Sequence, residues 1–147
     1  MKPFKFKETL RVRFAETDAQ GVVWNGHYLT YFDVAMTEYL RAMGLAYQQA
    51  VGEGFEFVLA HFEIDYRAPA AFDDPIDVHT GINRIGNSSI IFGFEMTNSD
   101  NGLLLTRGEA IYVVLDRRTG TPTQVPDRFR EVAGKFEGKD FSAANRG

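Results

Sequence analysis

Apolar and polar residues alternate along the first part of the chain, from residue 4 to residue 14. The positions on one side are Phe4, Phe6, Glu8, Leu10, Val12 and Phe14, and the residues between them are mostly Lys, Thr and Arg. A period of two places successive side chains on opposite faces of a strand, so this segment predicts a β-strand. Residues 15–27 carry Asp, Gln, Asn and two Gly, which predicts a loop.

The period lengthens to three and four residues between Tyr28 and Met43, which predicts a helix. Its recurring apolar positions are Tyr28, Tyr31, Phe32, Ala35, Tyr39 and Met43. Gly44 follows, where a left-handed C-terminal cap is expected. The polar residues form one narrow stripe of Thr30, Asp33, Thr37 and Arg41, with Glu38 beside it. A helix that is apolar around most of its circumference has to be wrapped by other elements, and its tyrosines are expected in the core, as is Trp24.

Four strand-like segments follow a weaker helical patch at residues 45–51, and they lie at 55–67, 76–82, 90–96 and 103–115. In the first of them, Phe62, Ile64 and Tyr66 are predicted to face inward. The alternating positions that share one face are Ile76, Val78, Thr80 and Ile82 in the second segment and Ile90, Phe92, Phe94 and Met96 in the third. Asp100-Asn101-Gly102 is a strong hairpin signal and Gly86-Asn87 a weaker one. Residues 126–135 predict a short terminal helix.

This order of elements predicts an α+β domain, in which a five-stranded antiparallel sheet curls around one long central helix. The chain has 147 residues, close to the commonest size of one domain. We therefore expect a single domain over residues 1–137 and a flexible C-terminal tail over residues 138–147. A fold class of this kind does not by itself indicate a function.

Composition narrows the possible chemistry. Hydrophobic residues make up 44% of the chain and include thirteen Phe, enough for a core without cross-links. The absence of cysteine excludes disulfides, thiolate metal sites and a cysteine nucleophile.

The net charge is −4, with no run of basic residues, so neither nucleic acid nor a membrane surface is an expected partner. No apolar run approaches the ~20 residues of a membrane helix. These features favour a cytoplasmic protein. His61, Glu63 and His79 lack metal-ligand spacing, so no metal site is expected.

The segment from Arg13 to Tyr28 places a carboxylate, a glycine-bearing loop and a helix start within about ten residues. The first amides of a helix lack intrahelical partners, and the helix dipole makes this end partly positive. Such donors stabilise the charge that develops on a carbonyl oxygen under attack. Asp18 could attack that carbonyl as a nucleophile or activate a water as a general base. This set of groups suits an activated acyl group such as a thioester.

Structural interpretations of the same residues remain open. An aspartate in a loop is commonly a turn former or a cap, so Asp18 could serve the backbone alone. Asn25 could be the N-cap of the helix. His27, beside a helix start, is commonly a cap-region or packing residue rather than an acid–base group.

At this segment the chain resembles the 4-hydroxybenzoyl-CoA thioesterase family of hot-dog proteins. The resemblance lies in Asp18, Gly21-Val22-Val23-Trp24, Asn25 and the helix opening Tyr28-Leu29-Thr30-Tyr31-Phe32-Asp33. It extends with gaps over most of the chain, through a turn at residues 67–74 and a hairpin at residues 85–89. The Asp–loop–helix motif is fairly specific for the family, and the later matches support it.

The resemblance implies a hot-dog fold, hydrolysis of an aromatic or short- to medium-chain acyl-CoA, and no cofactor beyond the coenzyme A of the substrate. It implies a homodimer joined edge to edge, often paired again into a homotetramer, with the active site at the dimer interface. The catalytic residues it implies are Asp18, Trp24 and Asn25. The substrate-binding residues it implies are Gly21, Val23, His27, Tyr28, Arg84 and Ser88.

The chain departs from the family pattern at two places. Asn25 and Trp24 combine features of separate branches, which leaves the acyl preference open. The hairpin that is basic in some relatives reads Gly86-Asn87-Ser88-Ser89 here, so Arg84 is the nearest cation for the CoA phosphates.

Two other functions compete with hydrolysis. A non-catalytic module could bind acyl-CoA or an acyl carrier, although the fold's sensors usually carry a DNA-binding extension for which this chain has no room. A hot-dog dehydratase could act on hydroxyacyl thioesters, although those sites generally need an Asp/His pair at another spacing than Asp18 and His27. The choice between CoA and acyl-carrier protein also stays open.

Overall fold

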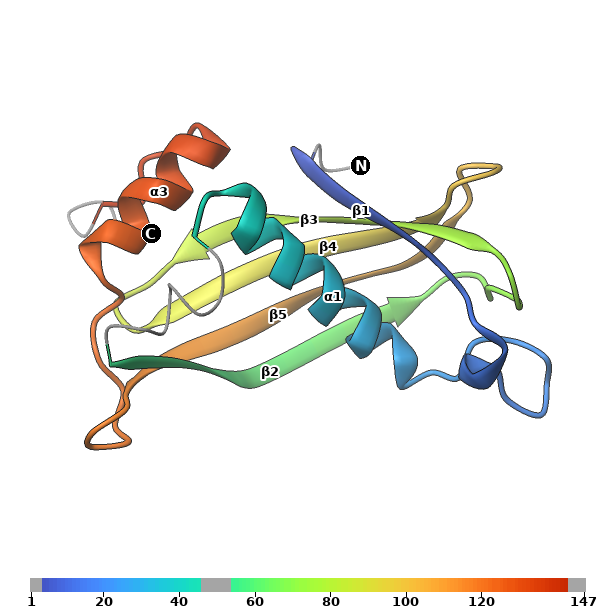
Figure 1. Cartoon of the computed structure of the whole chain (residues 1–147), viewed down its shortest axis with the longest axis horizontal. Helices are drawn as coiled ribbons and strands as arrows, with labels where there is room; N and C mark the ends of the chain where they lie inside the picture. The colour runs from blue at the N-terminus through green and yellow to red at the C-terminus, as the bar shows by residue number, and fades with distance from the viewer. Residues whose placement is uncertain (1–3, 46–53, 143–147) are drawn as a thin grey trace.

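A computed structural model describes residues 4–45 and 54–142 of the chain. One helix lies across one face of a five-stranded antiparallel sheet, and a second helix packs near one end of it (Figure 1). The strand order is β1-β3-β4-β5-β2, so β1 and β2 are the edges. The elements in chain order are β1 (Phe6–Arg11), the short 3₁₀ turn η1 (Phe14–Glu16), α1 (His27–Ala42), β2 (Phe55–Tyr66), β3 (Pro75–Ile85), β4 (Ser89–Asn98), β5 (Leu104–Asp116) and α3 (Asp127–Glu137). The predicted α+β architecture is confirmed.

Helix α1 is the centre of the core. Phe32 is fully buried, and its ring lies 5.2–6.1 Å from the rings of Phe62 on β2 and of Phe92 and Phe94 on β4. Full burial of such a side chain stabilises the fold by roughly 1.5–3 kcal/mol. The predicted polar stripe remains at the surface, with Thr30 and Asp33 exposed. The buried residues of the helix are Tyr28, Tyr31, Phe32, Ala35, Met36, Tyr39 and Leu40.

The predicted inward faces of β3 and β4 are correct. Val78 pairs with Met96, Thr80 with Phe94 and Ile82 with Phe92. Directly opposed residues share one face of a sheet, and all six of these are buried. The alternation read from the sequence therefore fixes which side of the sheet meets α1.

The first strand is shorter than predicted. It ends at Arg11, and Phe14 is 75% exposed within η1 instead of continuing the inward face. Local hydrogen bonds compete with the alternating pattern here, because the Thr17 amide and hydroxyl both donate to the Phe14 carbonyl, at 3.1 and 2.7 Å.

Strand β2 also departs from simple alternation. Its pairing with β5 shifts between Leu59 and His61, and as an edge strand it leaves Val58 and Leu59 partly exposed. Tyr66 contacts Tyr28 on α1, with ring centroids 5.6 Å apart, but it remains 51% exposed rather than entering the core.

The predicted turns are confirmed. Gly44 and Gly102 adopt positive φ values of 86° and 74° after α1 and in the β4–β5 hairpin. The Gly86 amide donates to the Ser89 carbonyl at 2.9 Å, which closes the β3–β4 hairpin. The predicted helical patch at residues 45–51 falls almost entirely outside the described residues.

The C-terminal segment packs back onto the domain as far as Ser142. Phe141 is 7% exposed, and Arg130 Nη1 of α3 donates to its carbonyl at 2.9 Å. Residues 138–142, predicted as the start of a flexible tail, are therefore held by α3, and residues 143–147 lie outside the described part. Neither helix described over residues 4–45 and 54–142 is long and apolar enough to span a membrane.

Gly108 tests how closely β5 approaches its neighbours. A Cβ at this position would lie 2.0 Å from the Glu63 carbonyl oxygen and 2.7 Å from Phe94 Cζ. We expect Gly108→Ala to lower the free energy of unfolding by about 1–3 kcal/mol, the usual cost of overpacking, in urea denaturation. Gly93→Ala is the control, because its Cβ would meet only the movable Asn83 side chain. Equal losses in the two variants would contradict the close approach.

Candidate active site

The Asp18 loop is a tight turn closed by the backbone. The Gly21 amide donates to the Asp18 carbonyl and the Asp18 amide to the Val22 carbonyl, both at 2.9 Å. Thr17 and Val23 form a bridge at the base of the loop. Gly21 has a φ of 80°, which suits the left-handed residue that completes such a turn. The predicted residue Gly21 therefore shapes the loop.

The Asp18 side chain is half-buried, and its two oxygens differ. Oδ1 accepts a hydrogen bond from the Gln20 amide at 2.8 Å, which is the turn-forming role expected of a loop aspartate. Oδ2 has no hydrogen-bond partner among the residues that the structure describes. One oxygen thus orients the carboxylate, and the other is available for chemistry.

Helix α1 begins at His27, and its N-cap residue is Gly26, which has no side chain to cap it. The expectation that Asn25 could be the N-cap is wrong. Asn25 is exposed, and its carbonyl accepts a hydrogen bond from the Tyr66 hydroxyl at 2.9 Å. The His27 amide donates to the Trp24 carbonyl at 2.9 Å. Because the glycine N-cap makes no side-chain hydrogen bond to the helix, the first turn presents a partial positive charge.

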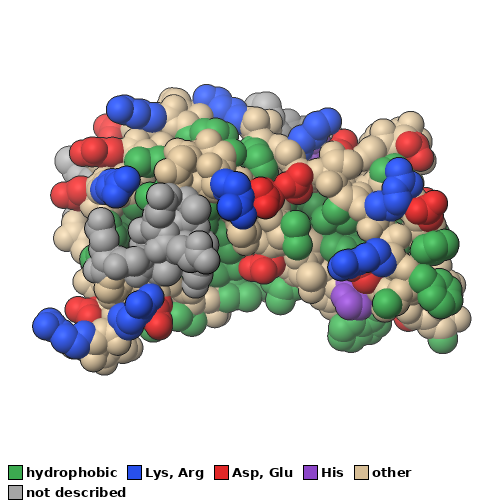
Figure 2. All heavy atoms as spheres, viewed as in Figure 1, with side chains coloured by type: hydrophobic (Ala, Val, Ile, Leu, Met, Phe, Trp, Pro, Cys, Tyr) green, Lys and Arg blue, Asp and Glu red, His purple; other side chains and the backbone are tan. Residues whose placement is uncertain are grey.

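Trp24 lies at the surface rather than in the core, with 55% of its area exposed. Its ring packs edge to face on His27 at 5.7 Å and passes close over Gly26, where a Cβ would lie 2.2 Å from the indole. The expectation that Trp24 is a core residue is wrong, whereas the tyrosines of α1 are buried as expected. Figure 2 shows apolar side chains at the surface at this end of the molecule, where α1 begins in Figure 1.

Val23 and Tyr28, two of the predicted substrate-binding residues, are buried and contact the backbone of Ala70. Val23 is 2% exposed and its amide donates to the Ala70 carbonyl at 2.9 Å. Tyr28 is equally buried, and burial raises the pKa of its hydroxyl despite a hydrogen bond to the Ala70 backbone. Within one chain, Val23 and Tyr28 therefore belong to the core, whereas His27 is half-buried.

The structure does not bring Arg84 and Ser88 near Asp18 within one chain. The Asp18 loop contacts residues 70 and 71, just before β3 begins at Pro75. Arg84 and Ser88 lie at the other end of β3, and a strand of 11 residues is about 35 Å long. These residues could share a site with Asp18 only if a second chain supplied them.

The sequence reading missed Glu16, which is 5% exposed. Its carboxylate accepts hydrogen bonds from the Arg13 amide at 2.8 Å, from Arg13 Nε and Nη2 at 3.1 and 2.8 Å, and from the Tyr31 hydroxyl at 2.8 Å. Burial alone would raise the pKa of Glu16, but these donors outweigh it and hold the pKa below its ordinary value. The Arg-x-x-Glu spacing was the signal available in the sequence.

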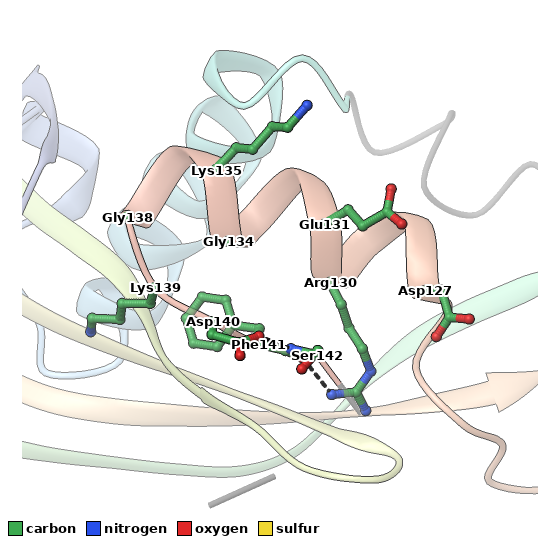
Figure 3. Close-up of a pocket in the computed structure, with 10 residues that line it drawn as sticks. All are labelled: Asp127, Arg130, Glu131, Gly134, Lys135, Gly138, Lys139, Asp140, Phe141 and Ser142. Atoms are coloured by element: carbon green, nitrogen blue, oxygen red, sulfur yellow. Dashed lines mark hydrogen bonds between the residues drawn. The ribbon is translucent and has the colours of Figure 1, made fainter. Parts of the chain in front are cut away.

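A separate cavity of about 580 Å³ lies between α3 and residues 138–142, near the other end of α1. Figure 3 shows Arg130 extending from α3 toward the Phe141–Ser142 segment. The guanidinium also donates to the carbonyls of Gly86 and Asn87, at 2.5 and 3.5 Å, so it ties backbone segments together. Within residues 4–45 and 54–142, no three His, Asp or Glu side chains are grouped to hold a metal ion.

Proteins of similar sequence match nearly the whole length of this chain. The family model of the thioesterase-like superfamily matches residues 12–133. The acyl-CoA thioester hydrolase YbgC of Escherichia coli O6:H1 is 31% identical over 132 residues, which cover 90% of this chain and 96% of YbgC. The acyl-CoA thioesterase YbgC of Haemophilus influenzae is 32% identical over 132 residues, covering 89% of this chain and 93% of that protein.

Solved structures agree on the fold. A hypothetical protein from Aquifex aeolicus superposes with a TM-score of 0.80 at 28% identity, covering 87% of this chain and 98% of that one. The 1,4-dihydroxy-2-naphthoyl-CoA thioesterase of Synechocystis superposes with a TM-score of 0.80 at 24% identity, over 87% of this chain and 94% of that one. The predicted hot-dog fold is confirmed.

The lowered pKa of Glu16 predicts a pH-dependent contribution to stability. A carboxylate whose pKa is depressed on folding stabilises the protein above its unfolded pKa, near 4.5, and loses this contribution as the pH falls through the folded value. We expect Glu16→Gln to be less stable than the parent at pH 7, with the difference shrinking below about pH 4. Urea unfolding across this range measures it, and a pH-independent difference would contradict the assignment.

Proposed function

The chain belongs to the thioesterase-like superfamily, and from that premise we propose that it hydrolyses aromatic or short- to medium-chain acyl-CoA to the free acid and CoA, with Asp18 as the reactive carboxylate. Hydrolysis of an acyl-CoA thioester is supported by the names of the curated relatives, which match nearly the full chain. The acyl group and the role of Asp18 are supported by the site itself.

One observation carries the proposal. A half-buried aspartate stands in a loop that leads directly into a helix whose glycine N-cap has no side chain, and within residues 4–45 and 54–142 one oxygen of that aspartate has no hydrogen-bond partner. The first-turn amides of α1 would polarise the thioester carbonyl, and removing one donor of this kind typically lowers the rate by roughly 100- to 1000-fold. Asp18 Oδ2 would attack that carbonyl, expelling the CoA thiolate and forming an acyl anhydride that water then hydrolyses, or it would deprotonate a water that attacks the carbonyl and expels the thiolate. A thioester is activated enough to need no Ser or Cys nucleophile.

Exposed aromatic rings beside the helix opening support the proposed acyl class. Trp24 and Tyr66 are each about half exposed, and the Tyr66 hydroxyl donates to the carbonyl of Asn25, next to Trp24 in the chain. Aromatic side chains offer large apolar contact areas and favour edge-to-face packing with other rings. An aromatic or medium-length acyl chain would therefore bind against them.

A second copy of the chain would complete the site. The edge strand β2 has 12 residues and pairs only with β5 among the described strands, so its outer edge offers backbone groups to another sheet. Pairing through β2 gives the homodimer that we propose, alone or as half of a homotetramer. Arg84 and Ser88 of a partner would then supply the polar contacts for the CoA that they cannot supply within one chain.

Asp18→Asn tests the catalytic role. Asparagine keeps an oxygen that can accept from the Gln20 amide, so the turn is expected to persist, while the charged oxygen is lost. We expect turnover of acyl-CoA to fall by about 100-fold or more in a thiol-release assay. Asp33→Asn, on the exposed face of α1, is the matched control and should retain parental turnover. Parental activity in Asp18→Asn would remove Asp18 from the mechanism, and tight binding without CoA release in the parent protein would indicate a binding module.

Val58→Lys tests the proposed edge. Val58 is 42% exposed on β2, and a charge on an edge strand opposes pairing with another sheet. We expect the parent protein to have two or four times the 16.6 kDa chain mass in light scattering, and the variant to shift toward smaller species. Val34→Lys, equally exposed on α1, should leave the mass unchanged. A monomeric parent protein would contradict the assembly.

A further inference from the structure

Glu16 connects the loop that carries Asp18 to the helix that supplies the amides. It lies two residues before Asp18, and its own carbonyl accepts a hydrogen bond from the Trp24 amide at 2.9 Å. Its carboxylate accepts from the hydroxyl of Tyr31, which stands one helical turn after the start of α1. Arg13 holds the same carboxylate from the other side through three donors. One buried residue therefore joins the two ends of the loop through its backbone carbonyl, and it joins the loop to the first turns of the helix through its carboxylate.

We propose that Glu16 is a positioning residue for the hydrolysis, which fixes the Asp18 turn at a set distance from the opening of α1. The inference rests on the proposed function, because it assigns Glu16 no contact with the substrate. Catalytic groups lose about 100-fold in rate when they are misplaced by roughly 1 Å. Asp18 and the α1 amides would act on the same carbonyl, so the turn and the helix have to be held at a fixed distance from each other.

A carboxylate suits the surroundings of residue 16 better than an amide does. All four groups around Glu16 are donors, and a carboxylate can accept all of them through its two oxygens. The amide of glutamine would offer one oxygen and would direct its own N–H groups at donors. Burial and the bond to Glu16 raise the pKa of Tyr31, which keeps its hydroxyl protonated and donating. Glu16→Gln thus conserves the shape of the side chain and the backbone bond from the Trp24 amide, while it disrupts the bonds of the carboxylate to Arg13 and Tyr31.

The chain contains a matched control at the other end of the same helix. Glu137 of α3 is 8% exposed and accepts a hydrogen bond from the Tyr39 hydroxyl at 2.5 Å. Tyr39 is eight residues after Tyr31 on α1 and close to the end of the helix at Ala42. The loop that precedes α1 lies at the opposite end of the helix (Figure 1). Both glutamates are buried acceptors for a tyrosine of α1, so both substitutions should cost stability. Only Glu16 lies beside the proposed chemistry.

The experiment measures kcat, KM and urea stability for Glu16→Gln and Glu137→Gln in the full chain, with an acyl-CoA that the parent protein hydrolyses. We expect both variants to lose stability, but only Glu16→Gln to lose kcat, by about 10- to 100-fold, with KM changing less than kcat. Adding Glu16→Gln to Asp18→Asn should lower the residual rate little further, because residues that act as a unit are not additive.

Each outcome separates this inference from the proposed function. An inactive Asp18→Asn together with a Glu16→Gln variant that turns over like Glu137→Gln would overturn the positioning role alone. Parental activity in Asp18→Asn would overturn the proposed function instead. If Glu16→Gln does not fold, Tyr31→Phe removes one hydroxyl from the same network, and Tyr39→Phe is its control. We then expect a several-fold loss of kcat in Tyr31→Phe alone, and equal kcat in the two variants would contradict the inference.

Discussion

The opening of α1 is the feature on which the rest of the site depends. A helix that starts at a glycine N-cap has backbone amides with no side chain to satisfy them, and its dipole concentrates partial positive charge there. Trp24 packs so closely over Gly26 that a side chain there would collide with the indole. A side chain at residue 26 is therefore excluded, and an anionic or polarised oxygen is the group that would satisfy the amides of the first turn.

Each end of α1 has a tyrosine that donates a hydrogen bond to a buried glutamate, but the two ends differ in how exposed their surroundings are. At its C-terminal end, Tyr39 is bound by Glu137 of α3, and aromatic contacts with Phe6, Phe92 and Phe136 surround its ring. These contacts hold this end of the helix in place and contribute stability. At its N-terminal end, Tyr31 is bound by Glu16, but the surrounding loop, Trp24 and Tyr66 remain partly exposed. The sheet and α3 thus hold the helix firmly while one end stays accessible.

The sequence predicted the features that depend on local periodicity or local turn chemistry. The spacing from Tyr28 to Met43 located α1 to within one residue, and Gly44 and Gly102 marked turns that need positive φ. The missed features depend on contacts between distant segments. Nothing near Glu16 in the chain indicates that Tyr31 approaches it, and nothing near Tyr66 indicates that its hydroxyl binds the Asn25 carbonyl. Asn25 is a better cap by residue preference than Gly26, yet the position of the Trp24 ring requires the glycine at residue 26.

The central claim is that the α1 amides polarise the carbonyl that Asp18 attacks or that an Asp18-activated water attacks. Infrared difference spectroscopy of a thioester with a ¹³C-labelled carbonyl, bound at saturation to the slow Asp18→Asn variant, measures this polarisation directly. Hydrogen bonds from the helix opening weaken the C=O bond, so the account predicts a stretching frequency below that of the same thioester in water. A bound carbonyl that absorbs at or above the frequency in water would contradict it.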